Sequence, residues 1–255
     1  WLTLGGNTLP LMEQARLCQR AENEYVGVNC GIMDQFASIC GQTDRLLYLD
    51  CRTLEWETLP LPPEVTIVIA DTRVRHKLTS GEYNLRRQDC EEAVRILKND
   101  LPTITSLRDV DLMQFNGLSD RLPLQVERHS RHVVEEIARV RNARVALDEG
   151  NIKQFGLFMN DCHRSLRDLF EVSCSELDMM VEIAQSLDGC YGSRLTGAGF
   201  GGCTVSLVEK SKAADFCERL GTQYLLQTKI KPEIYQTNAS RGVIVIDKKD
   251  VELLG

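Results

Sequence analysis

Residues 191–208 read YGSRLTGAGFGGCTVSLV, and the order of elements in this segment separates the nucleotide-binding folds that its glycines could indicate. Its alternating pattern predicts strands at Gly192–Thr196 and Cys203–Val208, joined by a glycine-rich loop. Gly197, Gly199 and Gly202 of that loop satisfy G-x-G-x-x-G, the pattern of a dinucleotide-binding turn. That turn must open directly into a helix, because the helix N-terminus holds the pyrophosphate. A strand follows here, so a dinucleotide-binding fold is excluded.

The loop contains Gly197, Gly199, Gly201 and Gly202 within six residues. That number exceeds what a tight turn without a ligand needs, so we expect a functional loop whose backbone approaches another group closely. The chain lacks the V-A-I-K, H-R-D and D-F-G motifs of protein kinases. It also lacks G-x-x-x-x-G-K-[ST], so neither a protein kinase nor a P-loop enzyme is indicated.

Apolar periodicity places further elements on both sides of this hairpin. Helices are predicted at residues 11–26, in a short segment after Gly31, and at 82–99, 124–147, 152–170, 175–187 and 213–227. Strands are predicted at residues 45–49, 53–59, 65–70, 233–237 and 242–246. The β-branched run at 65–70 is typical of a strand buried on both faces. Strands grouped around helices predict an α+β fold, with a domain boundary at the prolines of positions 60, 62 and 63.

Composition excludes several classes of protein. The 255 residues are 43% hydrophobic and 26% charged, with a net charge of −7, which argues against a nucleic-acid-binding face. Ten cysteines occur singly without C-x-x-C, as expected of small buried thiols in a reducing cytosol. No H-E-x-x-H indicates a zinc enzyme, and no signal peptide or membrane-spanning run is evident. Because the sequence opens at Trp1, we expect it to begin inside a longer protein.

Three acidic or hydroxyl-bearing side chains are candidates for chemistry. Gly31 precedes a predicted helix, and Asp34 falls in its first turn, where the helix dipole favours an ionised carboxylate. Such a carboxylate could accept a proton from a sugar hydroxyl, but by itself the pattern favours ordinary helix capping. Glu22 shares the stripe of Leu11, Ala15, Cys18 and Tyr25, an unusual place for a solvated glutamate. Tyr83 offers a hydroxyl at another helix start, beside an arginine pair expected to be solvated.

Taken together, five stretches resemble the galactokinases, sugar kinases of the GHMP superfamily. They are GVNCGIMDQF (27–36), LDCRTL (49–54), SGEYNLRR (80–87), HRSLRDLFEVS (163–173) and YGSRLTGAGFGGCTV (191–205). The match runs in order along essentially the whole chain. It implies that residues 1–62 are the tail of a domain resembling ribosomal protein S5 domain 2. Residues 63–255 would form a ferredoxin-like GHMP kinase C-terminal domain.

The resemblance also implies roles for individual residues. Asp34 matches the family's catalytic aspartate, acting as general base or as electrostatic anchor. Gly31, Asp34 and Tyr83 match positions that contact the sugar, and Glu22 matches the acidic ligand of Mg²⁺. The run from Gly197 to Gly202 matches a motif near the nucleotide phosphates, with Ala198 where many relatives have glycine.

The resemblance implies ATP-dependent phosphorylation of α-D-galactose, with Mg²⁺ as cofactor. It also implies a cytoplasmic, monomeric enzyme with no nucleic-acid or membrane partner. The family's sugar-binding arginine motif and its serine-rich ATP loop are absent from this chain, so the isolated chain is expected to be inactive. Two alternatives stay open: an N-acetylgalactosamine kinase and a non-catalytic galactose sensor on the same fold. The residues upstream of Trp1 would separate them most directly.

Overall fold

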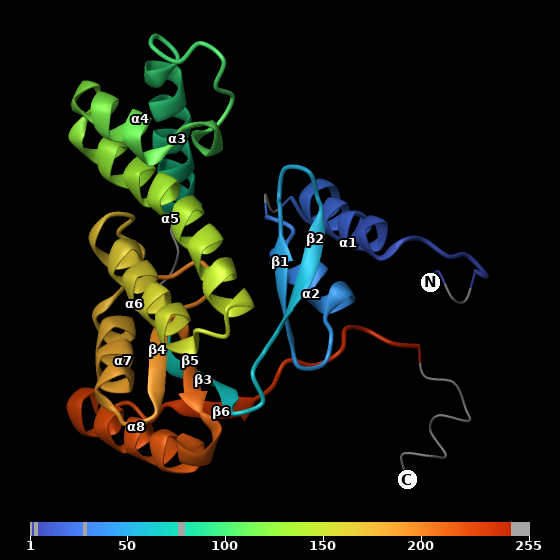
Figure 1. Cartoon of the computed structure of the whole chain (residues 1–255), viewed down its shortest axis with the longest axis vertical. Helices are drawn as coiled ribbons and strands as arrows, with labels where there is room; N and C mark the ends of the chain where they lie inside the picture. The colour runs from blue at the N-terminus through green and yellow to red at the C-terminus, as the bar shows by residue number, and fades with distance from the viewer. Residues whose placement is uncertain (1, 3–4, 28–29, 76–79, 246–255) are drawn as a thin grey trace. The chain divides into compact units, whose positions relative to one another are not determined.

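The protein is seen in a computed structural model (Figure 1), which describes residues 2, 5–27, 30–75 and 80–245, with residues 80–83 by their backbone alone. These residues form two compact units. The first comprises the chain up to Pro62 together with the residues from Asn238 onward, and the second comprises Pro63–Thr237. The chain therefore passes from one unit to the other at the proline cluster and returns near its end.

The first unit combines two helices with a β-hairpin. Helix α1 (Leu11–Arg20) continues into the π-helix η1 (Ala21–Val26), and helix α2 (Met33–Cys40) follows. Strands β1 (Arg45–Leu49) and β2 (Trp56–Pro60) pair antiparallel as a two-stranded sheet. The core of this unit comprises Ala15, Ile32, Phe36 and Cys40, against which the Trp56 ring packs.

The predicted strand at 242–246 is wrong for its described part. Residues 242–245 form no strand, because the N–H groups of Gly242 and Val243 donate to the carbonyl oxygens of Gly41 and Ser38, each at 2.8 Å. These bonds hold the segment against the end of α2 rather than in a sheet. They also explain why this segment groups with the first unit, whereas the sequence analysis assigns it to the domain of residues 63–255.

The second unit is built on a four-stranded antiparallel sheet in the order β4-β5-β3-β6. Its strands are β3 (Val65–Arg75), β4 (Cys190–Leu195), β5 (Gly201–Glu209) and β6 (Glu233–Thr237). Helices lie between β3 and β4, and α8 lies between β5 and β6, so the unit has the β-α-β-β-α-β connectivity of a ferredoxin-like fold. The expected α+β architecture is confirmed.

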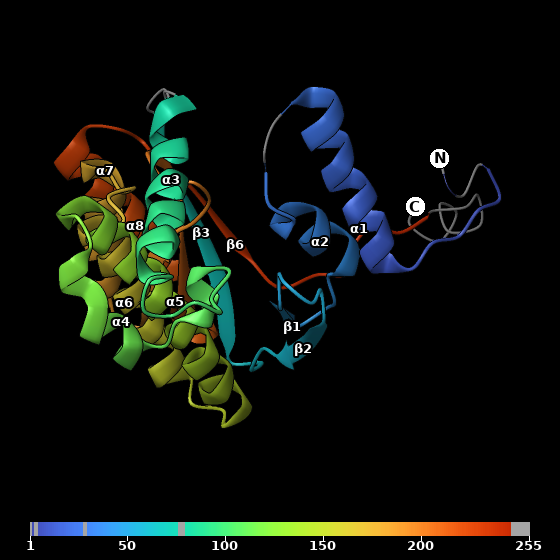
Figure 2. The ribbon, with the colours of Figure 1, turned by 90° about the horizontal axis from the view of Figure 1, so that it is seen from above.

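The helices of this unit contribute to two separate cores. The helices are α3 (Ser80–Leu97), α4 (Leu112–Leu118), α5 (Leu124–Asp148), α6 (Ile152–Asp168), α7 (Ser175–Ser186) and α8 (Ala213–Thr228), with 3₁₀ turns at Leu107–Asp109, Ser119–Arg121 and Lys210–Lys212. One core lies where α7 and α8 pack on β3 and β5, around Met180, Val208 and Tyr224. A second core, which includes the fully buried Phe115, joins α4 to α3 and α5, and these three helices lie next to one another in Figures 1 and 2.

Helix α6 packs on β4 at backbone distance. A Cβ on Gly156 would lie 2.0 Å from the carbonyl oxygen of Tyr191, and one on Gly192 would lie 2.1 Å from the carbonyl oxygen of Gly156. Both positions therefore require glycine. Across the same contact, the N–H of Ser193 donates to the side-chain oxygen of Asn160 at 2.9 Å.

All ten cysteines lie in the described residues as free thiols, but only Cys40 and Cys162 are buried. Burial raises the pKa of the Cys162 thiol to about 12. Cys18 and Cys51 are exposed and the other six are partly buried, so the expectation of buried thiols holds for two positions. Within the described part of the chain, no helix combines the length and the apolar character needed to cross a membrane.

Candidate functional site

Asp34 stands in the first turn of α2, on the solvent side. The helix is anchored from the opposite side by Phe36 and Cys40, which are buried, while Asp34 is exposed. Its carboxylate makes no hydrogen bond or ion pair with any residue that the structure describes. Gly31, just before the helix, is also exposed, and no residue that the structure describes lies within 4 Å of where its Cβ would be. The start of α2 therefore presents an unshielded carboxylate beside open space.

Glu22 lies on the π-helix η1, within reach of α2. Its Oε1 accepts a hydrogen bond from Gln35 Nε2 at 2.6 Å, and its Oε2 lies 3.4 Å from the Cys30 thiol. Burial and the neighbouring Glu22 carboxylate raise the pKa of that thiol. Gln35 directly follows Asp34 in sequence, so this hydrogen bond links Glu22 to the turn of α2 that carries Asp34.

The stripe that made a solvated Glu22 look unusual is itself largely exposed. Leu11 is 47% exposed and Tyr25 93% exposed, and only Ala15 of the stripe is buried. Glu22 itself is exposed. Its carboxylate is therefore hydrated and needs no buried partner to be tolerated there.

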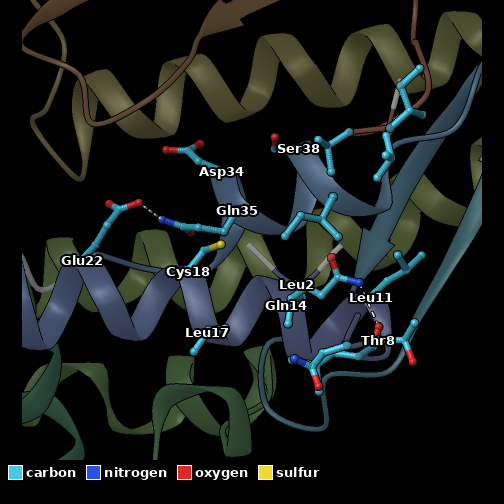
Figure 3. A pocket seen from close by; sticks show the side chains of 16 residues that line it. Leu2, Thr8, Leu11, Gln14, Leu17, Cys18, Glu22, Asp34, Gln35 and Ser38 are labelled. Carbon is cyan, nitrogen blue, oxygen red and sulfur yellow. Dashed lines mark hydrogen bonds between the residues drawn. The ribbon is translucent and has the colours of Figure 1, made fainter. Parts of the chain in front are cut away.

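Glu22 and Asp34 line a common pocket of about 840 Å³ within the first unit. Figure 3 shows both carboxylates at one end of the pocket, with the Gln35 amide beside Glu22 and Leu11 at the other end. The rest of the lining is mostly apolar and includes Val243 of the returning segment. The pocket thus has an acidic end that can act on a bound hydroxyl and an apolar end that cannot.

The glycine loop belongs to the second unit, between β4 and β5. Gly197, Gly199, Gly201 and Gly202 all have positive φ, from +81° to +116°. A Cβ on Gly199 would lie 2.1 Å from the carbonyl oxygen of Val172, and one on Gly201 would lie 2.5 Å from a β3 carbonyl oxygen. A hydrogen bond holds the loop against Val172, because the N–H of residue 200 donates to the same Val172 oxygen at 2.7 Å.

These dimensions correct the inference drawn from the glycine count. Every one of the four glycines is required by backbone conformation, and two of them also by close contact with the chain itself. The number of glycines therefore does not by itself indicate a ligand. Gly197 and Gly202 have nothing within 4 Å of their Cβ positions, so space for another group exists only on their side of the loop.

Tyr83 lies in the first turn of α3, and its side chain is outside the described residues. The two arginines that follow Tyr83 have different environments. Arg86 donates to the carbonyl oxygens of Phe170 and Glu171 at 3.2 and 2.8 Å and lies over the Phe200 ring of the glycine loop. Arg87 is exposed and pairs with Glu91 on its own helix. The expectation of a solvated pair is wrong for Arg86, which ties α3 to the glycine loop.

Magnesium binding can be tested against the donors present. No group of three His, Cys, Asp or Glu side chains in residues 2, 5–27, 30–75 and 80–245 could hold a metal ion. Proteins commonly bind Mg²⁺ through one or two carboxylates, with substrate phosphates and water as the other ligands. Glu22 fits that pattern as a single protein ligand, because it is exposed and, among the described residues, its Oε2 has only a weak contact with the Cys30 thiol.

Two features of this site were missed from the sequence. The helix predicted at residues 11–26 changes to π-helical hydrogen bonding at Ala21, a rare form that is often found at functional sites. The contact of Gln35 with Glu22 joins residues 13 apart in sequence, and no periodicity indicates it. The family stretch GIMDQ includes Gln35, but the resemblance implies a role only for Asp34 and not for Gln35.

Comparison with known proteins decides the family. A model described as "GHMP kinases N terminal domain" matches residues 2–42, and one described as "GHMP kinases C terminal" matches residues 143–225. A galactokinase of Roseiflexus sp. is 47% identical over 91% of this chain, and the human galactokinase is 45% identical over 83% of it. The chain belongs to the GHMP kinase family.

This GHMP kinase chain is shorter than the relatives it matches. It covers 59% of the Roseiflexus protein and 53% of the human protein. Among solved structures, a Lactococcus lactis galactokinase crystallised with galactose has a TM-score of 0.90 and is 34% identical, covering 96% of this chain. The GHMP kinase fold expected from the sequence is thereby confirmed, and the chain corresponds to 63% of that structure.

Proposed function

We propose that the protein to which this chain belongs is a galactokinase, transferring the γ-phosphoryl group of ATP to the anomeric hydroxyl of α-D-galactose. The observation that carries the proposal is Asp34, an exposed carboxylate at a helix start that shares a pocket with Glu22. The similarity to galactokinases over most of the chain supports galactose as the sugar.

In this proposal the sugar contacts Gly31, Asp34 and Tyr83. Asp34 accepts the proton of the anomeric hydroxyl or stabilises the charge that develops there. Its exposure leaves the carboxylate free to meet a substrate, since no described residue occupies it. Such transfer depends mainly on positioning and charge stabilisation rather than on covalent chemistry by the protein.

The nucleotide phosphates lie beside the glycine loop in this proposal, on the open side at Gly197 and Gly202. Glu22 would be the protein ligand of Mg²⁺, and the ion, when bound, would neutralise phosphate charge. Residues 1–62 form the end of the N-terminal GHMP kinase domain, and the following residues form the C-terminal domain. We place the enzyme in the cytoplasm, consistent with ten free thiols among the described residues, and we propose that it is a monomer.

The experiment supplies the N-terminal region that the matched relatives have and this chain does not cover. The chain is joined to the N-terminal region of the Roseiflexus galactokinase, and galactose-dependent ADP formation is measured. Asp34→Asn should lower kcat by roughly 10²–10⁴-fold, the usual contribution of a positioned base. Galactose affinity should stay within about tenfold, or about 1.4 kcal/mol. Asp44→Asn is the matched control, because Asp44 is an exposed aspartate of the same unit, and asparagine tolerates its positive φ of 55°.

Two results would reject the proposal. Galactose binding without ADP formation by the unmutated chimaera would favour a galactose sensor, and a preference for N-acetylgalactosamine would favour the related kinase. The isolated 255-residue chain should bind MgATP too weakly for calorimetry at millimolar nucleotide and should form no galactose 1-phosphate. Turnover by the isolated chain would show that the nucleotide site has been misplaced.

A further inference from the structure

Gln35 lies at the acidic end of the pocket, and packing alone does not explain why this buried position holds a glutamine. The residue is only 8% exposed, whereas its neighbours Glu22 and Asp34 are exposed. Its Nε2 donates to Glu22 Oε1 at 2.6 Å. Its Oε1 is buried and has no hydrogen-bond donor within the described part of the chain.

The orientation of this amide is set by its partner. An ionised carboxylate only accepts hydrogen bonds, so the NH₂ group of Gln35 must face Glu22 and the carbonyl oxygen must face inward. A buried acceptor without a donor lowers stability relative to an apolar side chain of the same shape. If the position only needed to be filled, methionine or leucine would serve it better. The amide is therefore best explained by what its N–H does to Glu22.

We propose that Gln35 is a positioning residue that fixes the carboxylate of Glu22 for cation binding. The inference rests on the proposed function, in which Glu22 is the protein ligand of Mg²⁺. Glu22 projects into solvent from the six-residue π-helix, and an exposed glutamate samples many rotamers. The bond from Gln35 occupies Oε1 and restricts the side chain, which leaves Oε2, with its weak contact to the Cys30 thiol at 3.4 Å, as the free ligand atom.

The same bond couples the two acidic groups. Gln35 and Asp34 are consecutive residues of α2, so the helix turn that carries the proposed catalytic carboxylate also holds the metal ligand. Outer partners of metal ligands act in this way generally, and their loss commonly weakens metal binding 10–100-fold. One turn of α2 thus positions both the Asp34 carboxylate, proposed to act on the sugar, and the Glu22 carboxylate, proposed to hold Mg²⁺.

The test is Gln35→Met, which keeps the volume and removes the donor. In the chimaera, the Mg²⁺ concentration for half-maximal rate should rise roughly 10–100-fold. Mn²⁺ binding in the presence of a non-hydrolysable ATP analogue, followed by electron paramagnetic resonance, should weaken by the same factor without any turnover. The melting temperature should stay equal or rise, because the mutation also removes a buried acceptor for which the described residues supply no donor.

Gln19→Met is the matched control. Gln19 donates to the backbone oxygen of Cys30 at 3.2 Å and does not contact Glu22. An equal weakening of Mn²⁺ binding in this variant would assign the effect to the backbone at Cys30 and overturn the proposal. So would a lowered melting temperature of Gln35→Met with unchanged metal binding. If the unmutated chimaera lacks kinase activity, the proposed function fails, while the Mn²⁺ measurement still decides the role of Gln35.

Discussion

The glycine loop between β4 and β5 offers a test that separates its structural from its functional glycines. Gly197 and Gly199 have nearly the same φ, +81° and +83°. They differ in surroundings, since the Cβ position of Gly197 is open and that of Gly199 overlaps the carbonyl oxygen of Val172 at 2.1 Å. Alanine at either position therefore incurs the same conformational strain, and only alanine at Gly199 adds a collision.

The magnitudes follow from these two terms. A left-handed conformation costs a residue with a Cβ about 1–2 kcal/mol, so Gly197→Ala should lower the free energy of unfolding by about that amount. Overpacking typically adds about 1–3 kcal/mol, so Gly199→Ala should lose about 2–5 kcal/mol. Urea unfolding of the isolated chain, followed by far-UV circular dichroism, measures both. The KM of the chimaera for ATP is then compared for Gly197→Ala and the unmutated protein.

If the open side of the loop faces the nucleotide, Gly197→Ala should raise the KM for ATP several-fold despite its small cost in stability. An unchanged KM for ATP and for galactose would place the nucleotide away from Gly197 and reduce the loop to a turn. Equal losses of stability for the two variants would refute the steric reasoning itself, since it depends on the contact with Val172.

Three further predictions concern single side chains. Tyr83→Phe should raise the KM for galactose several-fold, by about 0.5–1.5 kcal/mol, and leave the KM for ATP unchanged; equal effects on both would indicate a packing role. Glu22→Gln should raise the Mg²⁺ concentration for half-maximal rate, and a loss of stability without that rise would make Glu22 structural. Burial lowers the pKa of His132 from 6.5 to about 4, so the unfolded chain binds a proton that the folded chain does not between these values. The free energy of unfolding should therefore fall by about 3 kcal/mol as the pH drops from 6.5 to 4, and His132→Gln should remove that part of the acid dependence in urea titrations.

Regular elements with a strong apolar pattern were predictable from the sequence. The strand at Val65 and the helices around residues 124–187 all occur, because their burial follows periodicity. The strand β2 begins at Trp56 rather than residue 53, since Asp50 Oδ1 accepts from the N–H groups of Arg52 and Thr53 and holds them in a turn. Helix α4 was missed although Asp111 and Gln114 form a capping box, a signal that the sequence does carry.

The site was predictable only in part, and for a physical reason. Asp34 and Glu22 are separate in sequence, and nothing in local pattern indicates that they line one pocket. Their meeting depends on how α1 and η1 pack against α2, which is a tertiary property. The role of Arg86 was lost for the same reason, because its carbonyl partners lie 84 and 85 residues away. Family resemblance supplied the residues, and the contacts had to come from the structure.

The backbone contact between α6 and β4 has a consequence for hydrogen exchange. At Gly156 and Gly192 no side chain separates the helix from the strand, so the two elements cannot part locally without opening a gap. The amides of Ser193 and Leu195 donate across this contact to Asn160 and to Nδ1 of His163. Their hydrogens should therefore exchange with solvent only when the whole second unit unfolds, which makes them reporters of its global stability.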